Sequence, residues 1–141
     1  MKPVALVTAG SKRLGKTMAL RLAHRGYDLA LHYFSSQEDA RLTREELQLA
    51  GARAELFCAN LANEAEVEQL FRSVTDKFGR CDLLVNNASL FERDEALTST
   101  RDLWDAHMAI NLRAPFVLSQ ALARQDQSGS IVNMLDTRVL N

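Results

Sequence analysis

The sequence predicts a doubly wound α/β domain built on a parallel β-sheet. The first observation is a set of short apolar runs without polar–apolar alternation, typical of strands buried on both faces; they cover residues 4–7, 29–31, 54–57, 83–85 and 131–132. The second observation is that apolar residues recur at helical spacing between these runs. Because strands and helices alternate, right-handed crossovers should give one parallel sheet with helices on both faces.

Glycines delimit the expected helices. Gly26 and Gly51 should end the first two helices, and Gly79 should end the third, because glycine readily adopts the left-handed conformation at a helix C-terminus. The third helix has the clearest apolar stripe, which consists of Val67, Leu70, Phe71, Val74 and Phe78.

A longer helix should follow the fourth strand. Ser99 or Thr100 can cap its start, it should run past Leu118, and residues 126–129 should end it. The residues expected to face inward are Leu103, Ile110, Ala114, Val117 and Ala121.

The composition fits one globular domain and argues against several functions. The chain has 141 residues, 47% of them hydrophobic and 25% charged, with a formal net charge of −1. Acidic and basic residues are interleaved, so the sequence predicts no nucleic-acid partner and no membrane-binding surface. The N-terminus lacks the long apolar segment of a signal peptide, and we expect a cytoplasmic protein. Cys58 and Cys81 lack metal-ligand spacing; we expect buried free thiols and no metal site.

Residues 8–17, TAGSKRLGKT, fit two phosphate-binding motifs at once. Gly10, Gly15, Lys16 and Thr17 complete the P-loop pattern of nucleoside triphosphatases, in which the lysine contacts the terminal phosphates and the threonine binds Mg²⁺. The same strand, turn and helix can instead bind the pyrophosphate of a dinucleotide. A triphosphatase also needs an acid at the end of an apolar strand, which Asp136 could supply. The local pattern leaves both motifs open.

Other stretches of the chain favour the dinucleotide motif. Five features of the chain together resemble the short-chain dehydrogenase/reductase family, and within it the pteridine reductases. They are TAGSKRLG, LHYFSS after the second strand, NNAS after the fourth, Asn111 in the long helix and Asp136 after the fifth strand. The resemblance implies a Rossmann-type fold, in which Lys16 and Thr17 are ordinary first-turn helix residues. It also implies that Ala9 and Arg13 occupy the places of two family glycines.

The segment after the second strand favours NADPH. A carboxylate there would bind the ribose 2′-hydroxyl of NAD and repel a 2′-phosphate, but the strand ends at His32 and Tyr33. Lys12, Arg13 and Ser36 can bind a phosphorylated ribose. Because Ser35 stands where related pteridine reductases often have an arginine, we expect the phosphate to depend more on Lys12, His32 and Ser36. With the resemblance, the expected cofactor-binding residues are Thr8, Gly10, Lys12, Arg13, Leu14, Gly15, His32, Tyr33, Ser36, Asn60, Leu61, Asn87, Ala88 and Ser89.

Asn111 and Asp136 are the catalytic residues that the resemblance implies for this chain. Pro115 lies four residues after Asn111 and has no amide to bond the Asn111 carbonyl, so we expect a helix kink that frees this carbonyl. In the family, the corresponding asparagine holds a water molecule that links the catalytic lysine to solvent. Asp136 stands where most members have serine, and its carboxyl group suits a ring nitrogen that must gain a proton.

The expected substrate is a pterin, a dihydrofolate or a related compound with a conjugated C=N bond. The resemblance implies that Arg13, Ser89, Phe91 and Asp136 contact it, with Phe91 stacking on the flat ring. A carbonyl or 3-oxoacyl reductase of the same family is the nearest alternative. A dinucleotide-binding sensor module without catalysis is the second.

The family's catalytic tyrosine, with a lysine four residues later, is missing from this chain. Tyr27 and Tyr33 are its only tyrosines, and the residues four positions later are Leu31 and Gln37. We therefore expect residues 1–141 to be the dinucleotide-binding domain of a longer reductase, truncated before the Tyr-x-x-x-Lys helix, incomplete at its C-terminal side and inactive alone. The resemblance implies a homo-oligomer, expected to be a tetramer, for the complete protein.

Overall fold

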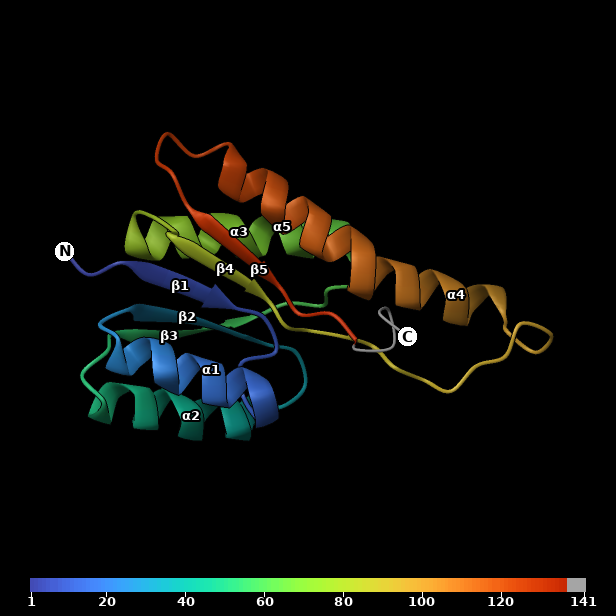
Figure 1. The fold of residues 1–141 in the computed structure, drawn as a ribbon, viewed down its shortest axis with the longest axis horizontal. Coiled ribbons are helices and arrows are strands. Elements are labelled where there is room, and N and C mark those ends of the chain that lie inside the picture. The colour runs from blue at the N-terminus through green and yellow to red at the C-terminus, as the bar shows by residue number, and fades with distance from the viewer. Residues whose placement is uncertain (137–141) are drawn as a thin grey trace.

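A computed structural model describes residues 1–136, whose core is a five-stranded parallel sheet with the order β3-β2-β1-β4-β5 (Figure 1). The strands are β1 (Val4–Val7), β2 (Asp28–Tyr33), β3 (Ala54–Cys58), β4 (Leu83–Asn86) and β5 (Ser130–Asn133). In the register, Leu6 lies between Ala30 of β2 and Leu84 of β4, at the fully buried centre of the sheet. This arrangement confirms the doubly wound α/β prediction.

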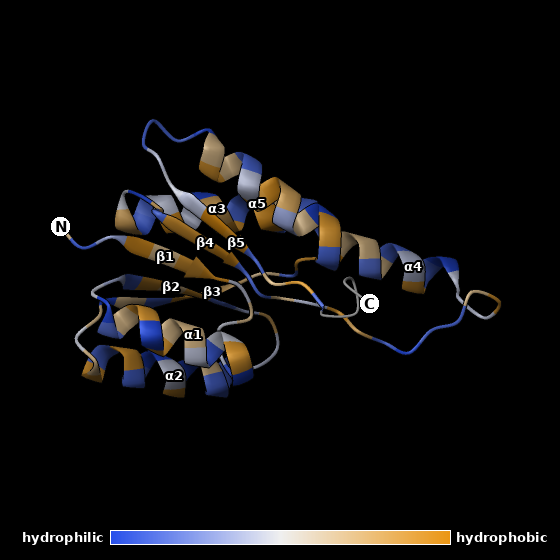
Figure 2. Cartoon of the chain, in the orientation of Figure 1, coloured by the Kyte–Doolittle hydropathy of each residue, from blue (hydrophilic) through white to orange (hydrophobic). Residues whose placement is uncertain are grey.

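Helices cover both faces of the sheet. Helices α1 (Arg13–His24) and α2 (Gln37–Leu49) pack on one face, and α3 (Glu64–Phe78) and α5 (Ala114–Ala123) pack on the other. Figure 2 shows the apolar strands between these layers and polar residues on the outer sides of the helices. Gly79 ends α3 at a φ of 81°, and Gly26 and Gly51 follow α1 and α2 with similar φ values, so the predicted helix ends are confirmed.

The long helix predicted after β4 consists of three segments. These are α4 (Arg101–Met108), a π-helical turn labelled η1 (Ala109–Arg113), and α5. Thr100 caps α4 by accepting the Leu103 amide, as predicted. The Ala114 amide bonds to the Ala109 carbonyl, one residue further back than in an α-helix. This wider turn lies directly before Pro115, whose missing amide disrupts the α-helical ladder, so the expected kink is a π-turn.

Two burial predictions were wrong because they depend on position in the sheet. The strand at residues 131–132 was expected to be buried on both faces, but every residue of β5 is exposed, since β5 is an edge strand. Cys58 was expected to be buried like Cys81, but it ends β3, the other edge strand, and is exposed. The predicted inward face of the long helix holds for the η1–α5 part, whereas α4 has no buried residue. No helix among residues 1–136 is both long and apolar enough to cross a membrane.

Candidate functional site

The candidate site lies where the strand order reverses. β1 and β4 are neighbours in the sheet, although β2 and β3 separate them along the chain. The chain leaves β1 toward one side and β4 toward the other, which opens a crevice beyond their carboxyl ends. Residues 8–12, called here the β1 loop, and residues 87–91, called the β4 loop, border this crevice.

Thr8 and Asn87 tie the two loops together. The Thr8 hydroxyl oxygen accepts the backbone amides of Asn87 and Ala88, both at 2.9 Å. In return, the Asn87 side-chain amide donates to the carbonyls of Thr8 at 3.1 Å and Ala9 at 3.3 Å. Thr8 is buried, so this predicted cofactor residue shapes the crevice, while Ala88 and Ser89 lie further toward its surface.

The β1 loop has a close-packed, strained path. Ala9 and Arg13 have φ values of 49° and 52°, in the left-handed region that favours glycine. A Cβ at Gly15 would lie 2.2 Å from the Ala9 carbonyl oxygen, and a Cβ at Gly10 would lie 2.5 Å from Leu31 Cδ1. Gly15 is therefore required for space because its nearest neighbour is backbone, whereas at Gly10 the Leu31 side chain would have to shift.

His32 lies behind the β1 loop and is buried, with 2% of its surface exposed. Its Nδ1 accepts the Ala9 amide at 3.0 Å, and its Nε2 bonds to the Ala59 carbonyl at 3.0 Å. Burial lowers the pKa of the imidazole below its usual 6.5. Since both ring nitrogens are engaged inside the protein, His32 is not available as a direct phosphate ligand, contrary to the sequence prediction.

Exposed basic residues surround the start of α1. Lys12, Arg13 and Leu14 are exposed, and no side chain caps the helix N-terminus at Lys12. Lys12 Nζ lies 3.5 Å from a carboxylate oxygen of Asp39 in the first turn of α2. Ser36 precedes α2 without making a side-chain capping bond, and Tyr33 is half-buried beside it. The uncapped helix start and the cations together favour an anionic group.

Lys16 and Thr17, the last two residues of the P-loop pattern, make contacts within and between helices. Lys16 Nζ bonds to the Glu46 carboxylate of α2 at 2.7 Å, and the Thr17 hydroxyl donates to the Arg13 carbonyl at 3.2 Å. Lys16 thus links α1 to α2, and Thr17 bonds within α1, as expected for ordinary first-turn residues. The lysine and the hydroxyl that a triphosphatase would use are therefore bonded to other groups in this structure, and no group of three or more potential metal-ligating side chains occurs within residues 1–136.

Asn60 and Leu61 lie just after β3. Asn60 Oδ1 accepts the Ala62 amide at 3.0 Å and closes a turn. The Leu61 side chain is buried in the core with the apolar face of α3. Only the backbone of Leu61 can therefore reach a ligand.

The predicted catalytic residue Asn111 anchors the β4 loop. Its Oδ1 accepts the Leu90 amide at 2.7 Å, and its Nδ2 donates to the Leu90 carbonyl at 2.8 Å. This pair connects η1 to the segment that carries Ser89 and Phe91, both exposed. The π-turn thus positions the loop on which the predicted substrate-stacking residue lies.

A hollow of about 360 Å³ lies beside this anchor, at the carboxyl ends of β4 and β5. Asn111, Ala88 and Leu135 are among its lining residues, as are Asn86 and Asn133, whose side chains bond between adjacent strands, from Asn86 Nδ2 to Asn133 Oδ1, at 2.8 Å. Asp136 follows Leu135 directly and is exposed at the same end of the sheet. The predicted catalytic and substrate residues therefore share the carboxyl edge with the β1 loop.

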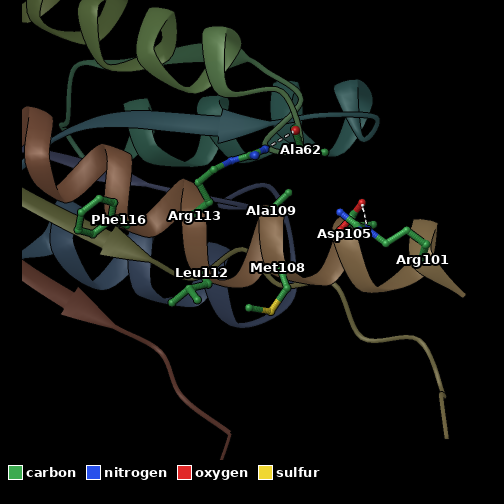
Figure 3. Close-up of a pocket in the computed structure, with 9 residues that line it drawn as sticks. Ala62, Arg101, Asp105, Met108, Ala109, Leu112, Arg113 and Phe116 are labelled. Atoms are coloured by element: carbon green, nitrogen blue, oxygen red, sulfur yellow. Dashed lines mark hydrogen bonds and ion pairs between the residues drawn. The ribbon is translucent and has the colours of Figure 1, made fainter. Parts of the chain in front are cut away.

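A larger hollow, about 820 Å³, lies along α4, η1 and α5 (Figure 3). Its large apolar lining residues are Met108, Leu112 and Phe116, and Arg113 donates to the Ala62 carbonyl at 3.0 Å. It contains none of the predicted site residues. Its size therefore carries no argument for the cofactor or substrate site.

The sequence pattern of the family described as short chain dehydrogenase matches residues 3–137, nearly the whole chain. The chain belongs to the short-chain dehydrogenase family. A 3-oxoacyl-[acyl-carrier-protein] reductase, FabG, of Staphylococcus epidermidis is 33% identical over 137 residues, which are 95% of this chain and 56% of that protein.

Solved short-chain dehydrogenase structures share this fold. A short chain dehydrogenase from Burkholderia cenocepacia in complex with NADP is 38% identical with a TM-score of 0.88, over 93% of this chain and 54% of that one. FolM alternative dihydrofolate reductase 1 from Brucella canis, complexed with NADP, is 34% identical with a TM-score of 0.90, and the match covers 97% of this chain and 57% of that one. The chain therefore spans little more than half the length of these relatives.

Sequence reasoning missed three features of this short-chain dehydrogenase site. The cross-loop bonds of Thr8 and Asn87 and the buried orientation of His32 depend on how loops pack. The contact between Lys12 and Asp39 depends on how α1 and α2 lie side by side. Only the polarity of Thr8 at the end of an apolar strand gave a signal for the first of these.

Proposed function

We propose that the crevice between the β1 and β4 loops binds NADPH, and that the complete protein carrying this chain is an NADPH-dependent short-chain reductase. The observation that carries the proposal is the close approach at Gly15, where a Cβ would lie 2.2 Å from the Ala9 carbonyl oxygen. This approach leaves a backbone cradle in front of an uncapped helix N-terminus, a geometry suited to a pyrophosphate.

The charges around the cradle suit a phosphorylated ribose. No acid follows β2 between His32 and Ser36, while Lys12 and Arg13 are exposed at the start of α1. Lys12 and Ser36 would hold the 2′-phosphate, and the backbone of residues 87–89 would lie along the ribose and nicotinamide. The NADP in the Burkholderia and Brucella structures supports the same choice.

The substrate we propose is a pterin or a dihydrofolate. Bound NADPH supplies a hydride to such a ring. Phe91 would stack on the ring and Asp136 would hold the proton for a ring nitrogen, while Asn111 fixes the β4 loop through Leu90. The name of the Brucella enzyme, a dihydrofolate reductase, supports this substrate class.

A 3-oxoacyl or carbonyl reductase is the second candidate. The Staphylococcus relative carries the name of a 3-oxoacyl-[acyl-carrier-protein] reductase, which favours a ketone substrate. Asp136 opposes this candidate, because a carboxylate disfavours the negative charge that develops on a ketone oxygen. A dinucleotide-binding sensor without catalysis is the third candidate.

We further propose a cytoplasmic homo-oligomer, with a tetramer as the expected state. Trp104, Met108, Leu112 and Phe116 recur every four residues along α4, η1 and α5, and each is at least 40% exposed. Exposed large apolar side chains at this spacing are a feature of protein interfaces. The hollow of Figure 3 lies along them, with charged residues such as Arg101 and Asp105 at its rim.

Titration of the complete protein with both cofactors tests the proposed function. NADPH should bind at least about tenfold more tightly than NADH, because a paired phosphate contributes about 1–3 kcal/mol. Equal affinities, or tighter binding of NADH, would contradict it. In parallel, turnover of dihydrofolate, dihydrobiopterin and a 3-oxoacyl thioester should be highest for the first two, and residues 1–141 alone should give none.

A further inference from the structure

We propose that His32 is a positioning residue, which holds Ala9 in its left-handed conformation and thereby sets the path of the phosphate-binding loop. The inference rests on the proposed binding of NADPH at this loop. It concerns the residue that the sequence suggested as a phosphate ligand, and it assigns that residue a different role.

His32 binds two consecutive amides of the β1 loop. Its ring nitrogen Nδ1 accepts the Ala9 amide at 3.0 Å, and its own backbone carbonyl accepts the Gly10 amide at 3.0 Å. On the other side, Nε2 bonds to the Ala59 carbonyl at 3.0 Å, which anchors the ring at the end of β3. The ring is therefore fixed at both nitrogens between a strand end and the loop.

Ala9 needs such a contact because its conformation is unfavourable for a residue with a Cβ. Its φ is 49°, in the region that glycine adopts without cost. An alanine persists there only where the surrounding bonds fix it. The Ala9 amide is held by His32, and its carbonyl is held by the Asn87 side chain.

Only one protonation state of His32 can make both ring contacts. Since Nδ1 accepts from the Ala9 amide, the ring proton must lie on Nε2, where it is donated to Ala59. A protonated ring would direct a second N–H at the Ala9 amide. Burial lowers the pKa of His32 and so favours the neutral ring that the geometry requires.

The conformation of Ala9 matters for phosphate binding because Ala9 borders α1. Its carbonyl oxygen occupies the space that a Cβ at Gly15 would enter. If Ala9 leaves the left-handed region, this carbonyl rotates, and the contact between loop and helix changes. The amides of the first turn of α1, which would face the pyrophosphate, then shift away from it.

A double-mutant cycle on the complete protein tests this role. His32→Leu should weaken NADPH binding at least about tenfold, because Ala9 is released from its left-handed conformation and the loop leaves the path that the pyrophosphate needs. In the Ala9→Gly background, His32→Leu should weaken NADPH binding less than about threefold, since glycine adopts the left-handed conformation unaided. An equal loss in both backgrounds would overturn the proposal.

Two further variants separate positioning from simple stability. His32→Asn keeps an acceptor near the Nδ1 position and should retain more affinity than His32→Leu. His24→Leu removes an exposed histidine that bonds within α1 and should leave the affinity unchanged. If His32→Asn is as weak as His32→Leu, the acceptor at Nδ1 is not the important feature and the proposal fails.

The cofactor-free protein provides a readout that does not depend on the proposed function. The fall in Tm caused by His32→Leu should be smaller with Ala9 than with Ala9→Gly, because release of Ala9 also relieves its backbone strain, whereas glycine has no such strain to relieve. If no variant binds NADPH but the Tm values show this coupling, the proposed function fails and the positioning role stands. If His32→Leu does not fold, ¹⁵N NMR of wild-type His32 decides: a proton on Nε2 alone supports the role, and a proton on Nδ1 overturns it.

Discussion

Replacing Gly15 with alanine should weaken NADPH binding about a hundredfold. The new Cβ would lie 2.2 Å from the Ala9 carbonyl oxygen and 2.7 Å from Asn87 Nδ2, whereas ordinary contacts begin near 3.4 Å. Because the nearest atom belongs to the backbone, it cannot rotate away, and α1 must separate from the loop by about an ångström. Overpacking costs about 1–3 kcal/mol, and about 3 kcal/mol corresponds to two orders of magnitude in affinity.

Gly26→Ala is the matched control for this experiment. Gly26 has a φ of 89°, and no described atom beyond its chain neighbours lies within 4 Å of its Cβ position, so alanine there adds backbone strain at the far end of α1 without a clash. Both variants should lower the Tm, but fluorescence titration should show a weaker NADPH complex for Gly15→Ala alone. An unchanged NADPH affinity for Gly15→Ala would refute the reasoning that this close approach forms the phosphate cradle.

Three other predictions follow from single contacts. The free energy of unfolding should fall as the pH drops below 6.5, because His32 then binds a proton in the unfolded chain but stays neutral in the folded protein, where burial lowers its pKa. Thermal unfolding from pH 7.5 to 5.5 should show this fall in the wild type and lose it in His32→Gln. A flat wild-type profile would contradict the prediction. Asp39→Asn should strengthen NADPH binding about two- to threefold at low salt, because Lys12 then loses its ion pair with Asp39 and can bind the phosphate. Added salt should remove this effect, and an unchanged Kd at low salt would contradict the prediction. Asp136→Ser in the complete protein should lower the turnover of a pterin or dihydrofolate about a hundredfold, because the proposed proton donor is lost, while the affinity for NADPH stays unchanged. Unchanged turnover would remove Asp136 from the mechanism.

Much of this fold could be predicted because its signals are local. The apolar runs of β1 to β4 and the stripe of α3 follow from periodicity, and Gly79 ends α3 in the left-handed conformation that the sequence predicts. The π-turn before Pro115 was foreseeable as a kink, because proline removes an amide from the helix. Its hydrogen-bond pattern was not, since the chain can bend around a proline in several ways.

The remainder of the site depends on packing between segments distant in the chain. The exposure of Cys58 and β5 follows from their edge positions, which strand order alone determines. His32 was expected to contact a phosphate because Ser35 stands where related pteridine reductases often have an arginine. Its ring instead turns inward to Ala9 and Ala59, a choice that depends on two backbone groups that lie 23 and 27 residues away in the sequence.

A crystal structure of the complete protein with NADP⁺ would test the central claim most directly. The pyrophosphate should lie against the N-terminus of α1, within hydrogen-bond distance of backbone amides of the β1 loop or the first turn, and the 2′-phosphate should lie beside Lys12 and Ser36. Ala9 should keep its left-handed φ and its bond to His32. A nucleotide bound at Lys16 and Thr17, or in the hollow beside Met108 and Phe116, would contradict the account.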